Sequence, residues 1–462
     1  MTSTLTRQTG LTPRVAAYAT GLRSEAISPE VVDRTKQLFL DFLGVALGGV
    51  AFGHASAEFR TAVRQLMDGA TGRCTVVGDP AGYPAHFAAL LNAAYAHSMD
   101  FDDTHRDAVT HPGTPLFAGL LAVGEPRGCS GRDFLTAAVA GYEINGQLGR
   151  AHAQRVHRRG FHPTATTGIF AVTAAAGRLM GLDQGVIEHA LGLDLSFAAG
   201  TAQFSEGGGS NKPVQVGMAA HNALYSLALA AAGVSGATRP LEGRYGYFNA
   251  YAEPGSAVEG IDLDPTRAGE VLTVAVKPYP ACRYNHASID GVSALVQREA
   301  LTPDDILAID LAMPPDGYKI VGTPPEAKRR PATIVDAQFS VYFAAAVAAA
   351  GPAYTWDSYR RLTDPTIEAL MDRTSARAAD LTGMATDVTV TSRHGAWTMN
   401  VPFPKGEPEV PIAWPEVEAK FLSLSSGLLG ATRAREVIAA VRRLETVDNI
   451  GELTRLLRPE TT

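Results

Sequence analysis

Cysteines and basic runs are scarce in this chain of 462 residues, and each shortage excludes a class of protein. The three cysteines are Cys74, Cys129 and Cys282, and their spacing matches no zinc-binding motif. An odd number without a pairing pattern predicts reduced thiols, as in a cytoplasmic protein, rather than a disulfide framework. No block of Lys or Arg stands out and the formal net charge is −7, so we expect no nucleic-acid partner.

Long apolar runs are also absent. The longest, residues 223–234, is shorter than the roughly 20 residues that cross a bilayer. The first twelve residues are polar and lack the apolar segment of a signal peptide. With 46% apolar and 19% charged residues, the chain has the composition of a globular protein large enough for two domains. We therefore expect no membrane partner.

Helical patterns dominate the first half of the chain. Ser28-Pro29-Glu30 is a helix start signal, and apolar residues follow it at helical spacing. Alanine-rich helices are expected over 131–150, 166–181 and 217–233, whereas 74–77 is strand-like.

The pattern changes near residue 265. Strands are predicted at 271–276, 307–313 and 386–391, where apolar residues are β-branched or alternate with polar ones. Helical segments lie between them, near 286–299, 336–350 and 364–374, and helices return after 402. The sequence thus predicts a mainly α protein with an α+β insertion.

Residues 97–111 are the most informative stretch, with four carboxylates, three histidines and an arginine. They follow an apolar-periodic helix that starts near Pro84, so Asp100, Asp102 and Asp103 fall at or past its C-terminal end. The helix dipole disfavours a carboxylate there by roughly 0.3–1 kcal/mol, and the acids repel one another. Such a cluster indicates chemistry or a bound cation, although a solvated loop has the same composition.

A basic residue directly precedes a proline at four places: His111-Pro112, His162-Pro163, Lys212-Pro213 and Lys277-Pro278. Proline suits the first turn of a helix, where backbone N–H groups and the dipole attract anions. If these helix ends converge, they form a pocket for a multiply charged anion, in which a neutral His111 or His162 can accept a proton. Arg283 can clamp a carboxylate in bidentate fashion. Each pair, taken alone, is more often a plain turn than a functional site.

Several motifs together make the chain similar to the MmgE/PrpD family, which includes 2-methylcitrate dehydratases, cis-aconitate decarboxylases and iminodisuccinate epimerases. The likeness spans nearly the whole chain, in family order. The matching stretches are His97-Ser98-Met99-Asp100-Phe101-Asp102-Asp103-Thr104, His111-Pro112, Gly160-Phe161-His162-Pro163-Thr164, Lys277-Pro278-Tyr279-Pro280-Ala281-Cys282-Arg283-Tyr284, Asp336-Ala337-Gln338-Phe339-Ser340 and Glu416-Val417-Glu418-Ala419-Lys420-Phe421.

The resemblance implies a large helical domain built from both chain ends, residues 1–266 and 403–462, with a smaller α/β lid domain, residues 267–402. It implies a homodimer that needs no metal and no organic cofactor, with its active site between helical domain and lid. Carried over by motif, the catalytic residues would be Asp100, His111, His162, Lys212 and Lys277, and the substrate-binding residues Thr104 and Tyr318, with Arg283 added from its chemistry.

Departures from the family pattern leave the substrate open, among them two single residues. Asp102 stands where the methylcitrate dehydratases usually carry Asn, and Gln215 stands where a histidine usually follows the lysine. The expected function is a cofactor-free lyase, a dehydratase or decarboxylase, that moves a proton next to a carboxylate on a small polycarboxylate. The lysines and Arg283 would hold carboxylates, His111 or His162 would be acid or base, and Asp100 would orient one of them.

Three alternatives remain at this point. An epimerase or isomerase of a dicarboxylate would share the same carbanion-like intermediate. Asp102-Asp103-Thr104-His105-Arg106-Asp107 also resembles the acidic Mg²⁺ site of a helical isoprenoid synthase, which 7% aromatic residues fit poorly. The third is a non-catalytic protein that binds polycarboxylates.

Overall fold

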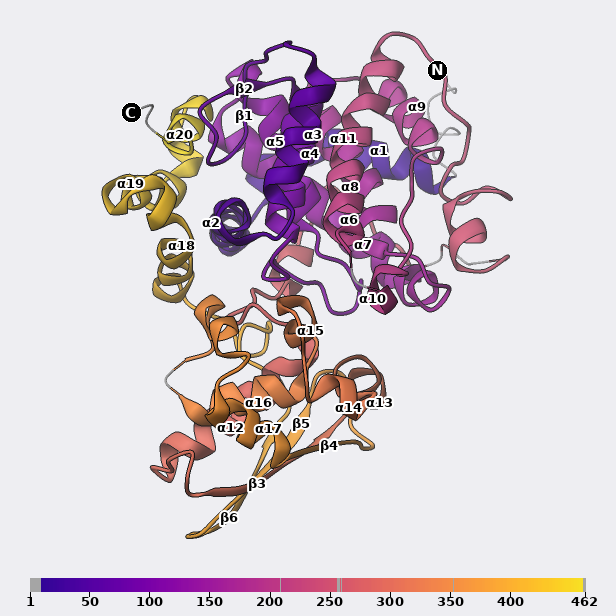
Figure 1. Cartoon of the computed structure of the whole chain (residues 1–462). Coiled ribbons are helices and arrows are strands. Elements are labelled where there is room, and N and C mark those ends of the chain that lie inside the picture. Colours follow the sequence, from indigo (N-terminus) through magenta and orange to yellow (C-terminus); the bar gives the residue numbers. More distant parts are fainter. Residues whose placement is uncertain (1–9, 208, 256–257, 259, 352, 460–462) are drawn as a thin grey trace. The chain divides into compact units, whose positions relative to one another are not determined.

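The computed structural model describes residues 10–207, 209–255, 258, 260–351 and 353–459. The chain forms two compact units, one of Met1–Ala275 with Ala413–Thr462 and the other of Val276–Ile412. Figure 1 shows mostly helices, with a short strand pair and a four-stranded sheet, which confirms the mainly α fold class with a minor α/β part.

The first unit is almost entirely helical. Its one strand pair is short, with Cys74–Thr75 (β1) antiparallel to Gly82–Tyr83 (β2). Its described helices are α1 (Leu11–Gly21), α2 (Pro29–Phe52), α3 (Ser56–Met67), α4 (Ala85–His97), α5 (Gly113–Gly124), α6 (Gly131–Arg158), α7 (Pro163–Thr166), α8 (Gly168–Leu179), α9 (Gln184–Asp194), α10 (Phe204–Gly207), α11 (Asn211–Ala231), α18 (Trp414–Leu429), α19 (Ala431–Arg442) and α20 (Gly451–Leu456).

Helix α2 forms the centre of this unit. The predicted start signal is confirmed, because Ser28 caps the helix by accepting from the Val31 amide and Pro29 occupies the first turn. Helix α18 packs against α2, and the Lys420 ammonium lies 2.6 Å from the buried Asp41 carboxylate. This ion pair attaches a helix from the C-terminal part of the chain to one from the N-terminal part.

By length and composition, α2 is the one described helix apolar enough to cross a membrane, yet 83% of its most apolar window is buried inside the protein. A core helix has this combination of properties.

Helices α2, α5 and α11 pack closely against α4. Gly49 on α2 permits one of these approaches, since a Cβ there would lie 2.0 Å from the carbonyl oxygen of Tyr95 on α4. The end of α4 at His97 is therefore held rigidly, and the acid-rich run leaves it at a defined place.

The second unit contains a four-stranded sheet in the order β4-β3-β5-β6. Its strands are β3 (Ile306–Met313), β4 (Thr374–Ala378), β5 (Thr386–Ser392) and β6 (Gly395–Val401), with only the β3–β4 pair parallel. The described helices are α12 (His286–Arg298), α13 (Pro315–Gly317), α14 (Pro325–Lys328), α15 (Ile334–Gln338), α16 (Val341–Ala350) and α17 (Pro365–Asp372). The predicted strands 307–313 and 386–391 are confirmed.

The predicted strand at 271–276 is wrong. Glu270–Thr273 forms a 3-10 helix, and only Ala275 pairs, through a single bridge to Thr104. The Glu270 carboxylate explains the difference, because it accepts hydrogen bonds from His105, Gln147 and Arg150, and this anchoring turns the backbone back on itself. Periodicity cannot show such a polar anchor.

Candidate active site

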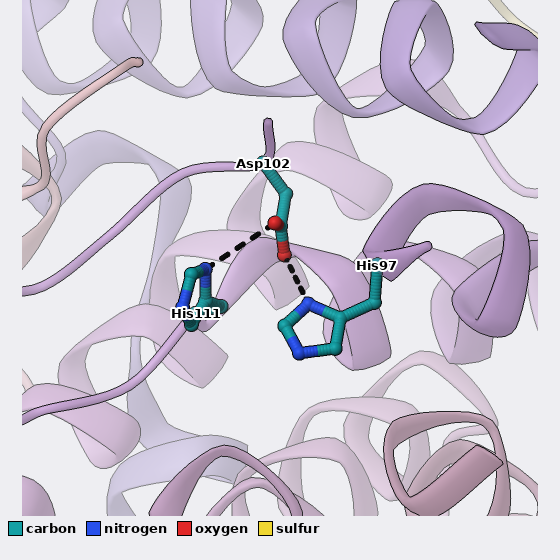
Figure 2. Close-up of side chains that lie close together, drawn as sticks. All are labelled: His97, Asp102 and His111. Carbon is teal, nitrogen blue, oxygen red and sulfur yellow. Dashed lines mark hydrogen bonds and ion pairs between the residues drawn. The ribbon is translucent and has the colours of Figure 1, made fainter. Parts of the chain in front are cut away.

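Three side chains at the end of α4 and the start of α5 form the centre of the site. Figure 2 shows the carboxylate of Asp102 between the rings of His97 and His111. His97 Nδ1 lies 2.7 Å from Asp102 Oδ2, and His111 Nδ1 lies 3.3 Å from Oδ1. The Thr114 hydroxyl donates to Oδ2 at 2.6 Å. One buried carboxylate thus faces two imidazoles.

The charge on this carboxylate fixes the tautomer of His97. Burial alone would raise the pKa of Asp102, but the neighbouring His111 and His97 outweigh it and hold the pKa well below its usual range. Burial lowers the pKa of His97 to about 4. At neutral pH an ionised Asp102 only accepts, so the neutral His97 must carry its proton on Nδ1. Its Nε2 is buried and has no hydrogen-bond partner among the described residues.

A third imidazole, His162, lies next to these two. Its ring is nearly parallel to that of His97, with centroids 5.6 Å apart, while the His97 and His111 rings meet edge to face at 4.8 Å. The His111 amide donates to the Thr164 hydroxyl, which ties the acid-rich run to α7. Burial lowers the pKa of His162 well below the ordinary value, and the adjacent His97 and Lys212 add to the effect.

The orientation of His162 is set by Gln215. The Gln215 amide nitrogen donates to the Thr201 carbonyl at 2.9 Å, which directs Gln215 Oε1 towards His162 Nδ1, also at 2.9 Å. An amide oxygen only accepts, so His162 carries its proton on Nδ1 and presents Nε2 as an acceptor. Gln215, like Asp102 another departure from the family pattern, therefore contacts a site residue directly.

An ion pair completes the cluster. Lys212, in the first turn of α11, places its ammonium 2.5 Å from Asp100 Oδ1, with both side chains largely buried. Asp100 has φ +50°, in the left-handed region where non-glycine residues are strained. Val109, on the other side of the acid-rich run, has φ +52°. Strain on both sides of a buried polar cluster is typical of functional sites.

The acidic run contains one candidate metal group, but its closest contact is that of a hydrogen bond. His97, Asp102 and His111 are the one described group with the residue types and spacing to hold a metal ion. Two ligands of one tetrahedral Zn²⁺ would lie about 3.3 Å apart, whereas 2.7 Å between His97 Nδ1 and Asp102 Oδ2 is a hydrogen-bond distance. The next acid, Asp103, accepts from the Tyr142 hydroxyl and the Gly113 amide. Both acids are engaged by protein donors, which disfavours the isoprenoid-synthase interpretation.

Four of the predicted residues meet in this cluster. All four lie in the first unit: Asp100 pairs with Lys212, while His111, His162 and Lys212 interact electrostatically with His97. Thr104 follows the acids there, with its amide bonded to the Ala275 carbonyl and its hydroxyl buried. The carboxylate placed against the histidines is that of Asp102, while Asp100 contacts Lys212.

The other three predicted residues belong to the second unit. Lys277 is buried, and Tyr318 packs against the apolar core of that unit. The Arg283 guanidinium is buried, forms an ion pair with Glu407 at 2.7 Å and donates to the Lys405 carbonyl. Glu407 and the Lys405 carbonyl thus engage Nε and Nη1, whereas Nη2 lies beside Glu407 without a hydrogen bond among the described residues. The protein therefore uses part of the guanidinium that the sequence assigned to a substrate carboxylate.

His97 and Gln215 are the site residues that sequence reasoning missed. His97 is the last residue of α4, five positions before Asp102, and it begins the motif that carries the family likeness. This position at the start of the acid-rich run was the feature of the sequence from which a role for His97 could have been predicted.

Comparison with known proteins points to one family. The model of the MmgE/PrpD N-terminal domain matches residues 13–258, and that of the C-terminal domain matches residues 279–446. A cis-aconitate decarboxylase-like protein from Aspergillus oryzae is 26% identical, with 98% of each chain covered. The cis-aconitate decarboxylase of Homo sapiens is 27% identical over 97% of this chain and 94% of its own. That of Aspergillus terreus is 28% identical over 63% of this chain and 61% of its own.

Proposed function

This chain belongs to the MmgE/PrpD family, and we propose from that premise that it is a lyase acting on a small polycarboxylate of the cis-aconitate type. The observation that carries the proposal is the cluster in the first unit. It brings three imidazoles and an ammonium group together with two carboxylates, on elements far apart in the sequence.

The cluster suits proton transfer beside a carboxylate. Decarboxylation of cis-aconitate breaks one C–CO₂ bond, and the electron pair spreads over the alkene and a remaining carboxylate. A proton then adds to carbon, so one trianion and one proton give CO₂ and an unsaturated dicarboxylate. An acid is needed near the carbon, and a cation is needed near the charge that develops.

We assign these tasks to residues of the cluster. The Lys212 ammonium stabilises the negative charge, and Asp100 holds that ammonium in place. His111 or His162 takes up a proton on Nε2 and delivers that proton to carbon, since Asp102 and Gln215 direct their Nδ1 atoms and leave Nε2 for the reaction. Thr104 binds substrate next to Asp103. Lys277 and Tyr318 keep their proposed roles on the family likeness alone, and no cofactor enters the reaction.

Epimerisation of a dicarboxylate is the second candidate. It needs one group to remove a proton and another to return it on the opposite face of the same carbon. His111 and His162 provide two imidazoles that face separate partners, Asp102 and Gln215, which is the observation that favours this alternative.

A substrate panel followed by NMR in D₂O tests the proposal. Purified protein is incubated with citrate, methylcitrate, cis-aconitate and iminodisuccinate. We expect cis-aconitate to lose CO₂ and to gain one deuterium at carbon. Exchange of a C–H proton of iminodisuccinate for deuterium, without loss of CO₂ or water, would indicate that the protein is an epimerase and not a lyase. Thermal stabilisation by polycarboxylates without turnover of any would indicate a binding protein instead.

A further inference from the structure

We propose that His97 is a positioning residue, which fixes the shared carboxylate of Asp102 and supports the ring of His162, so that both reacting imidazoles keep a productive orientation. This inference rests on the proposed function for its kinetic consequences. Its structural part, the tautomer and the partners of His97, stands independently of any reaction.

Burial assigns His97 an indirect role. The side chain has no exposed surface, while the His111 side chain is 17% exposed. A group so completely enclosed acts on substrate through its neighbours. These neighbours are both candidates for the proton transfer, because the ring of His97 contacts His111 edge to face and His162 face to face.

The hydrogen bond to Asp102 is the first half of the mechanism. An isolated carboxylate facing one histidine can rotate about its terminal torsion, whereas Oδ2 here is held by both His97 and Thr114. This leaves Oδ1 directed towards His111 at 3.3 Å. His97 therefore determines how Asp102 meets His111.

The second half of the mechanism is the effect of His97 on the electrostatic interaction between Asp102 and His111. The charged and titratable groups that face His97 are Asp102 from the acid-rich run, His111 before α5, His162 before α7 and Lys212 from α11. When the His97 donor is lost, the ionised carboxylate attracts a proton on His111 more strongly. A His111 that must be protonated to deliver its proton then stays active to higher pH.

Three substitutions separate these contributions. In His97→Asn, the amide nitrogen takes the place of Nδ1 and can still donate to Asp102. In His97→Gln, the amide lies nearer the place of Nε2, and in His97→Phe the stacking ring remains without a donor. The matched control is His152→Phe, which removes another buried imidazole of the first unit, one that packs against Phe248.

We expect His97→Phe to lower kcat about 10- to 100-fold with little change in KM, and to move the basic limb of the kcat/KM profile upward by about half a pH unit or more. His97→Gln should resemble it, and His97→Asn should recover most of kcat and the original pH profile. His152→Phe should lower the stability of the protein and keep the wild-type kcat and pH profile. If all three His97 variants lose activity equally, without a change in pH profile, the residue has only a packing role and the proposal is wrong.

Long-range ¹H–¹⁵N spectra of the wild-type protein provide a readout that needs no turnover. We expect one buried histidine, assigned by its absence in His97→Asn or His97→Gln, to carry its proton on Nδ1 at pH 7 with an unprotonated Nε2. A proton on Nε2 or a cationic ring would overturn the proposal. Wild-type protein that shows the predicted tautomer but turns over no polycarboxylate would refute the proposed function and leave the tautomer and partners of His97 established.

Discussion

The ion pair between Lys212 and Asp100 allows a quantitative test. At 2.5 Å and an effective dielectric constant of about 20, two unit charges attract by about 7 kcal/mol. Desolvation offsets most of this attraction, because the side chains are 16% and 8% exposed. Removing one partner of a fully buried pair costs about 3–5 kcal/mol, so with some solvent access we expect Lys212→Met to lower the free energy of unfolding by about 2–3 kcal/mol.

A double-mutant cycle tests whether Lys212 and Asp100 stabilise the protein through their mutual contact or each independently of the other. Because Asp100→Asn removes the charge that Lys212→Met leaves behind, the double variant should be more stable than the sum of the single losses predicts, by at least about 1 kcal/mol. Urea unfolding at pH 7.5 measures these free energies. Activity should stay absent in the double variant, since the ammonium is needed for the reaction.

The control is Lys36→Met, which breaks the pair between Lys36 and Glu445 elsewhere in the first unit. It should lose stability and keep kcat/KM for the folded protein. Zero coupling in the cycle, or full activity in the double variant, would refute the reasoning about Lys212.

Three further predictions follow from other parts of the site. Burial raises the pKa of Asp103 to about 8, so the folded protein keeps a proton there that the unfolded chain releases above about pH 4. The stability that this proton contributes is therefore lost as the pH rises towards 8. Asp103→Asn should flatten this loss of stability in thermal melts between pH 5 and 9, and an unchanged slope would show that Asp103 is ionised. Val109→Asn should stabilise the protein by about 0.5–1 kcal/mol, because Asn tolerates a φ of +52° better than a β-branched residue; urea titration measures it, and a loss of stability would contradict the strain. Exhaustive dialysis against a chelator should leave kcat unchanged, whereas loss of activity that Mg²⁺ or Zn²⁺ restores would disprove cofactor-free chemistry.

Local signals predicted much of the first unit. Proline and capping residues located the starts of α2 and α4, and helical periodicity located the end of α4, so the acid-rich run was placed correctly after it. The basic residues before prolines predicted three members of the cluster, because His111, His162 and Lys212 all lie at helix starts.

Tertiary contacts decided what sequence patterns could not. Which carboxylate meets which cation depends on side-chain directions, so Asp102 contacts the histidines while Asp100 contacts Lys212. Arg283 has the sequence of a substrate clamp, but Glu407, 124 positions away, already binds its guanidinium. His97 looked like the ordinary end of a helix until the fold placed two other imidazoles beside its ring.

The central claim is that the imidazoles of the first unit deliver a proton to carbon beside a carboxylate. The most direct measurement is deuterium incorporation from D₂O during turnover of cis-aconitate, by wild type, His111→Gln and His162→Gln, with folding checked by thermal melts. We predict one deuterium per product molecule for wild type, and a rate about 10²- to 10⁴-fold lower in at least one folded variant. Wild-type rates and labelling in both variants would contradict the account.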